Sequence, residues 1–66
     1  MTEEELLARV VAADRRVHEA ETRLAELKRA RAEVALAALG GGVTQYRIAQ
    51  ATGRRQSAVA QWRKMV

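Results

Sequence analysis

The sequence predicts an all-α protein in which one long N-terminal helix is followed by two short helices. The chain of 66 residues has no proline and only two aromatic residues, and its many Ala, Leu, Arg and Glu residues favour helices over strands. No glycine interrupts the stretch from Leu6 to Leu39, so one helix can continue through it. Glycines 40–42 and Gly53 then divide the remainder into two short segments. We therefore expect a long helix over 1–39, a glycine hinge over 40–43 and a two-helix region over 44–66.

The long helix is expected to begin at Thr2. Glu5 follows three residues later, and this spacing forms a capping box, in which each side chain satisfies a backbone N–H of the other residue. A helix over 1–39 would be about 57 Å long at a rise of 1.5 Å per residue. The rest of the chain is too small to cover such a helix, so we expect much of it to pack against another molecule.

The apolar residues of the long helix recur with the heptad spacing of a coiled coil. Arg31 is the one residue that breaks the pattern, because it falls at position a. The alternative is an amphipathic helix that packs within one chain. The predicted dimer seam, at positions a and d, consists of Leu6, Val10, Ala13, Val17, Ala20, Leu24, Leu27 and Val34.

Charges beside the seam favour a parallel homodimer. Positions g and e hold Arg9, Arg16 and Arg23, and Asp14, Glu21 and Lys28, respectively. In a parallel pair Arg9 would face Asp14 of the other chain and Arg16 would face Glu21. Only Arg23 against Lys28 would be unfavourable, whereas an antiparallel pair would set the arginines against one another.

The charge of the chain is divided unevenly along its length. Residues 1–39 hold seven Lys/Arg and eight Asp/Glu, for a net charge of −1, whereas residues 40–66 hold five Lys/Arg and no acid, for +5. A basic segment without a carboxylate favours a phosphate-bearing polymer as its partner. The simpler alternative is a basic tail that aids solubility.

The end of the long helix is apolar on almost every face. A two-stranded seam does not require an additional apolar face, but a cluster with two further helices does. This face, which predicts that the end of the long helix is the first member of a three-helix cluster, is formed by Ala32, Ala35, Leu36 and Leu39.

Two short helices are expected after the glycines. Thr44 is a favourable N-cap for a helix over 45–52, and Val43 can pack on Ile48 as a hydrophobic staple. Gly53 ends that helix and permits a tight turn. A last helix is expected over 55–64, with Val59 and Trp62 one turn apart on its inner face.

Residues 45–64 resemble the twenty-residue helix-turn-helix of bacterial and phage repressors. That motif has an apolar fourth residue, a small fifth, glycine ninth and apolar fifteenth and eighteenth residues. Thr52 and Arg54 are more polar than usual for the motif. With two residues of the long helix, the matching positions give the predicted motif core: Leu36, Leu39, Ile48, Ala49, Gly53, Val59 and Trp62.

The resemblance covers 20 of the 66 residues and is greatest to repressors of the lambda type. It implies that Gln45 braces Gln56 against an adenine and holds a phosphate, and that Ser57 faces a base edge. The long coiled coil departs from that family, whose domains are compact helical bundles. The resemblance therefore bears on the DNA-reading region and not on the dimer.

The outer face of the last helix carries residue types that read DNA bases. Arginine pairs with guanine, glutamine with adenine, and a small alanine can contact a thymine methyl group. The predicted base-reading residues are Arg55, Gln56, Ser57, Ala60, Gln61 and Lys64. Residues nearer the rims would hold phosphates and fix the register on the duplex, namely Thr44, Gln45, Tyr46, Arg47, Arg54 and Arg63.

The sequence predicts no catalytic or metal site and no cofactor. The chain has no cysteine, and its one histidine, His18, falls on the exposed side of the long helix. No segment has the apolar length of a membrane span or the pattern of a secretory signal. We expect a cytoplasmic, nucleoid-associated homodimer that binds double-stranded DNA as a small transcriptional regulator, with no small-molecule ligand. The alternatives are a sequence-indifferent architectural protein of a phage or plasmid and a coiled-coil adaptor that binds proteins.

Overall fold

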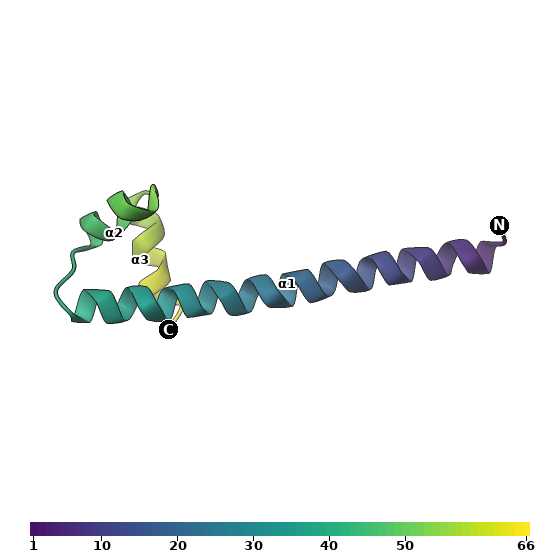
Figure 1. Cartoon of the computed structure of the whole chain (residues 1–66), viewed down its shortest axis with the longest axis horizontal. Coiled ribbons are helices and arrows are strands. Elements are labelled where there is room, and N and C mark those ends of the chain that lie inside the picture. The colour runs from purple at the N-terminus through teal and green to yellow at the C-terminus, as the bar shows by residue number, and fades with distance from the viewer.

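The computed structural model describes all 66 residues and contains three helices and no strand (Figure 1). Helix α1 spans Glu3–Gly40, α2 spans Gln45–Thr52 and α3 spans Gln56–Lys64. The all-α prediction is therefore confirmed, with one long helix followed by two short ones. The last helix begins one residue later than predicted, because Arg55 has an extended backbone and serves as its N-cap.

Both ends of α1 are fixed by local hydrogen bonds. At its start the Thr2 hydroxyl accepts a hydrogen bond from the Glu5 N–H at 3.2 Å. At its end Gly42 has a φ of 97°, and the Val43 N–H donates to the Ala38 carbonyl at 3.0 Å. Together with the bond from the Gly42 N–H to the Leu39 carbonyl, this is the Schellman arrangement that ends many helices. The predicted hinge thus begins inside α1 and continues as a hydrogen-bonded turn.

The molecule is elongated because α1 extends far beyond the other two helices (Figure 1). Its principal extents are 60 × 19 × 15 Å and its radius of gyration is 18.5 Å. A compact chain of this length would have a radius of gyration of roughly 11 Å. None of the three helices is long and apolar enough to cross a membrane.

The hydrophobic core lies at the C-terminal end of α1, where α3 packs against both α1 and α2. We call α2 and α3 together the C-terminal pair. Three of the five buried residues are alanines, so the helices approach closely around one large aromatic ring. The buried residues are Ala32 and Ala35 of α1, Ala49 of α2, and Val59 and Trp62 of α3.

Of the four α1 residues predicted to face the cluster, Ala32 and Ala35 are buried in the core, whereas Leu36 and Leu39 are not. Leu36 is 42% exposed, whereas Leu39 and Ile48 are half-buried. Because Leu36 follows Ala35 by one residue, its side chain is turned about 100° away around the helix. The α1 contribution to the core therefore comes from the two alanines, and the expectation for Leu36 does not hold within one chain.

The apolar stripe of α1 has no neighbour in this chain. Val10 is 63% exposed and Val34 is 71% exposed, and the other large seam residues are exposed too. The accessible surface of the molecule is 5590 Å². A compact protein of this mass would expose roughly 4,200 Å². The excess is on the order of 1,400 Å², which exceeds the ≈ 800 Å² that each partner buries in a standard interface.

Candidate nucleic-acid interface

Short-range interactions set the angle between α2 and α3. The Thr44 hydroxyl accepts a hydrogen bond from the Arg47 N–H at 3.2 Å, which caps the start of α2. At the other end Gly53 adopts the left-handed conformation with a φ of 68°. The Arg54 N–H then donates to the Ala49 carbonyl at 3.0 Å. The predicted cap and the predicted glycine turn are both present, and together they direct α3 across the end of α2.

The inner face of α3 is defined by Val59 and Trp62, which are 0% and 4% exposed. Helical periodicity turns the opposite face, centred on Ser57, Ala60 and Gln61, toward solvent. Of the six residues predicted to read bases, Ala60 is half-buried and the others are exposed: Arg55, Gln56, Ser57, Gln61 and Lys64. Their guanidinium, amide, hydroxyl and ammonium groups therefore stand on an accessible surface, as direct base readout requires.

Gln45 links the start of α2 to the start of α3. Its side-chain amide donates to the backbone carbonyl of Gln56 at 3.1 Å. The resemblance to repressors implied that these two residues act together, and the structure brings them into contact, although through the main chain of Gln56. The contact fixes the first turn of α3 and leaves the Gln56 side chain exposed.

The residues predicted to hold phosphates lie around this surface. Gln45 is half-buried and the other five are exposed: Thr44, Tyr46, Arg47, Arg54 and Arg63. The Tyr46 hydroxyl accepts a hydrogen bond from the Gln50 side-chain amide at 3.2 Å, which positions it along α2. Arg54 has a second contact, because its guanidinium carbon lies 5.9 Å from the centroid of the Trp62 ring.

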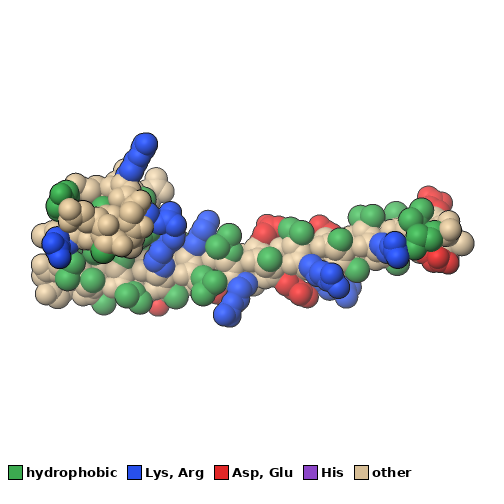
Figure 2. Space-filling model, turned by 45° about the horizontal axis from the view of Figure 1, so that its top comes forward, with side chains coloured by type: hydrophobic (Ala, Val, Ile, Leu, Met, Phe, Trp, Pro, Cys, Tyr) green, Lys and Arg blue, Asp and Glu red, His purple; other side chains and the backbone are tan.

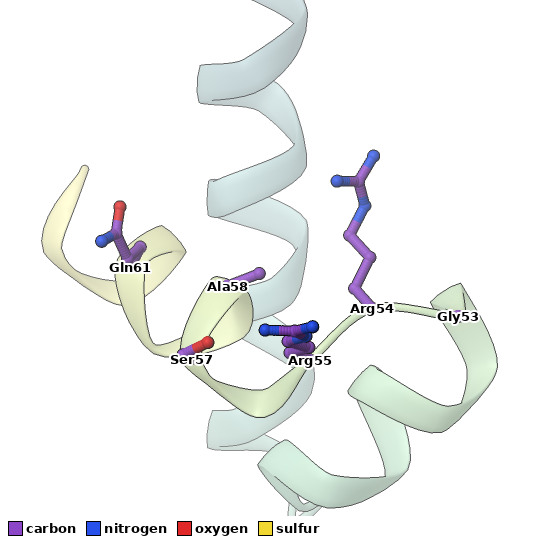
Figure 3. Close-up of a pocket in the computed structure, with 6 residues that line it drawn as sticks. All are labelled: Gly53, Arg54, Arg55, Ser57, Ala58 and Gln61. Atoms are coloured by element: carbon purple, nitrogen blue, oxygen red, sulfur yellow. The ribbon is translucent and has the colours of Figure 1, made fainter.

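An open notch of about 480 Å³ lies at the start of α3. Figure 3 shows its lining residues, with Ser57 and Gln61 on α3 and Arg54 pointing away from them along α1. No side chain caps this end of α3, so its first backbone N–H groups have no side-chain acceptor. Backbone donors at a helix start beside arginine suit an anionic group such as a phosphate. The lining residues are Gly53, Arg54, Arg55, Ser57, Ala58 and Gln61.

No carboxylate side chain opposes the positive charge of this region. The last acidic residue is Glu33, which forms an exposed ion pair with Arg29 at 3.5 Å on α1. On the face shown in Figure 2, acidic side chains lie along α1 and none lies on the C-terminal pair. All five basic residues after position 40 are exposed, so the potential around the C-terminal pair attracts anions.

Sequence reasoning missed the structural role of Arg31. Its guanidinium carbon lies over the Trp62 ring, 4.4 Å from the ring centroid, in a cation–π contact. The Nε atom of Arg31 is buried without a hydrogen-bond partner. The break in the heptad pattern could have indicated this role. At Arg31 an arginine replaces an apolar residue, at the point where α3 crosses α1.

No protein-family model, curated protein sequence or solved structure is significantly similar to this chain. No group of three or more acidic or histidine side chains is arranged to hold a metal ion. The features of the molecule that bear on function are the surface of the C-terminal pair and the apolar stripe of α1.

Proposed function

We propose that this chain is a sequence-specific, homodimeric DNA-binding protein that acts as a small transcriptional regulator. The observation that carries the proposal is the outer face of α3, where exposed arginine, lysine and glutamine side chains stand together without any carboxylate. In this role α2 and α3 form a helix-turn-helix, and α3 enters the major groove of double-stranded DNA. The proposed activity is binding without catalysis or a cofactor.

The dimer in this proposal is a parallel coiled coil of α1. It is supported by the exposed seam residues and by the excess accessible surface described above. Two C-terminal pairs related by a twofold axis would read an inverted repeat, with half-sites about one helical turn apart. A dimer also supplies enough positive charge to contact several phosphates at once.

Selection of bound duplexes from a random DNA pool would identify the site, and paired variants would then test the reading surface. We expect Gln56→Ala to cost about 1–3 kcal/mol on the selected duplex and little on random DNA, because it removes a base contact. Arg63→Ala should weaken binding to both duplexes about equally, because phosphate contacts carry no sequence information. Thr22→Ala is the control, since Thr22 is exposed on α1 and lies outside the C-terminal pair.

The salt dependence of binding separates the proposal from its two alternatives. Three or four phosphate contacts per subunit give a log–log slope on the order of −5 to −7. Strong salt dependence with equal affinity for all sequences would instead indicate an architectural protein. Absence of DNA binding at low salt would indicate a protein-docking adaptor and would overturn the proposal.

A further inference from the structure

An apolar groove of about 410 Å³ lies between α1 and the C-terminal pair, on a different side from the exposed face of α3. Its floor is formed by Ala30, Val34 and Ala38 of α1, and its wall by Ile48, Thr52 and Trp62. Exposed apolar grooves are a feature of surfaces that bind another protein, a membrane or a small ligand. The surface proposed to bind DNA does not use this groove.

The floor of the groove is the C-terminal end of the predicted seam. Val34 is the last d position and Ala38 is the last a position of the heptad pattern. Because α1 is one uninterrupted helix from Glu3 to Gly40, its apolar stripe leads directly from Leu27 into the groove. A helix that pairs with the stripe over residues 6–27 and stays parallel to α1 therefore has to enter the groove.

We propose that α1 of a second copy of this chain fills the groove, so that each C-terminal pair packs against the long helices of both chains. The inference depends on the parallel dimer of the proposed function and extends it to the DNA-reading region. It also assigns a function to the apolar wall of the groove, to which half-buried Ile48 and the edge of buried Trp62 contribute.

The residues at position g, beside the seam, change in type at the level of α1 where the C-terminal pair packs against it. Position g holds arginine at the first three heptads and then alanine, at Ala30 and Ala37. In a parallel coiled coil, residue g faces position e of the partner five residues later, so Ala30 faces the partner's Ala35. Ala35 is 7% exposed because α3 covers it. An arginine at this level would collide with the wall of the groove, whereas alanine allows the partner helix to approach.

Charge complementarity favours the same occupant. The core residues Ala32 and Ala35 occupy positions b and e, so the C-terminal pair lies on the b–e side of its own helix. Across a parallel interface that side faces the g–c side of the partner. Position c of the partner holds Glu26 and Glu33. These carboxylates would lie beside the basic C-terminal pair.

Arg31 supplies a local reason for a partner that offers a hydrogen-bond acceptor. Its guanidinium lies against Trp62 at the groove, and its Nε atom is a buried donor without an acceptor. An unsatisfied buried donor is unfavourable, so an acceptor from a second chain would stabilise the complex. Because each C-terminal pair would pack against both long helices, the two DNA-reading surfaces would be held rigidly on opposite flanks of the helix pair.

Site-directed cross-linking tests this arrangement cleanly, because the chain has no cysteine. Chains carrying Thr52→Cys are mixed with chains carrying Ala30→Cys, allowed to exchange subunits and treated with a short bis-maleimide. We expect a product of doubled mass in denaturing gels from the mixture and none from either variant alone. Ala8→Cys replaces Ala30→Cys in the control mixture, because Ala8 lies on the outer side of α1, and this mixture should give no product.

Val17→Cys tests the seam separately, because position a residues of a parallel dimer lie opposite each other. Cross-linking of Val17→Cys together with the Thr52–Ala30 product supports the inference. Cross-linking of Val17→Cys without the Thr52–Ala30 product would overturn the inference and leave the dimer intact. Failure of both would remove the parallel dimer as well, whereas DNA binding is measured independently.

Discussion

The first 30 residues and the last 36 residues contain similar apolar side chains, but these have opposite environments. Along the N-terminal part of α1, Val17 is 55% exposed and Leu24 is 51% exposed. In α3, Val59 is 0% exposed and Trp62 is 4% exposed. The difference is that three helices meet in the C-terminal region, whereas no other element of the chain reaches the N-terminal part of α1 (Figure 1).

This contrast indicates where each region obtains its stability. The C-terminal region has a small core of its own, formed by residues from all three helices. The N-terminal part of α1 has only its backbone hydrogen bonds and its cap, and helices without tertiary packing are marginally stable in water. The one salt bridge in the structure, Arg29–Glu33, is exposed and contributes little. We infer that association stabilises the N-terminal region.

The largest expected effect comes from charging the seam with Val17→Glu combined with Leu24→Glu. An uncompensated charge buried in an apolar interface costs about 3–5 kcal/mol, which a small dimer cannot absorb. Sedimentation should show a monomer, and circular dichroism should show loss of helix. His18→Glu with Ala25→Glu is the matched control. Each residue follows a substituted seam residue by one position and lies at position b, outside the seam. A folded dimer of the seam variant would show that the seam is wrongly assigned.

A smaller effect is expected from Trp62→Ala, which removes the one large ring of the C-terminal core. Trp→Ala substitutions in cores cost about 3–5 kcal/mol, and Arg31 would also lose its cation–π partner. Hydrogen exchange should show loss of protection in α2 and α3, with less change near Leu6. Tyr46→Ala serves as the control because Tyr46 is 55% exposed. Equal loss of protection in the two variants would contradict the observed core.

The smallest effect is expected from substitutions of the glycines between the two regions. These substitutions test whether residues 40–42 form a structured turn or a loose hinge. Gly42 has a φ of 97°, so Gly42→Ala should destabilise the protein by about 1–2 kcal/mol. Gly40 lies in the last turn of α1 with nothing within 4 Å of an added Cβ, so Gly40→Ala should stabilise by about 0.5–1 kcal/mol. Thermal denaturation would measure both. Two near-zero changes would favour a flexible hinge.

Most element boundaries could be predicted because they depend on neighbours in the sequence. Thr2 and Thr44 each accept a hydrogen bond from the backbone three residues ahead, and Gly53, at the predicted turn, adopts a positive φ. The inner face of α3 followed from the spacing of Val59 and Trp62. These features depend only on the types and spacing of a few consecutive residues, and both can be read from the sequence.

The sequence by itself determined the three helices, the division of charge and the residues available on the outer face of α3. Only the tertiary structure decided that Arg31 packs on Trp62, that Gln45 bonds to the backbone of Gln56, and that Leu36 is exposed. Each of these depends on how far α1 is rotated about its axis beneath α3, or on how closely the starts of α2 and α3 approach. Such contacts join residues as many as 31 positions apart, and the packing of side chains around Trp62, rather than any local pattern, sets them.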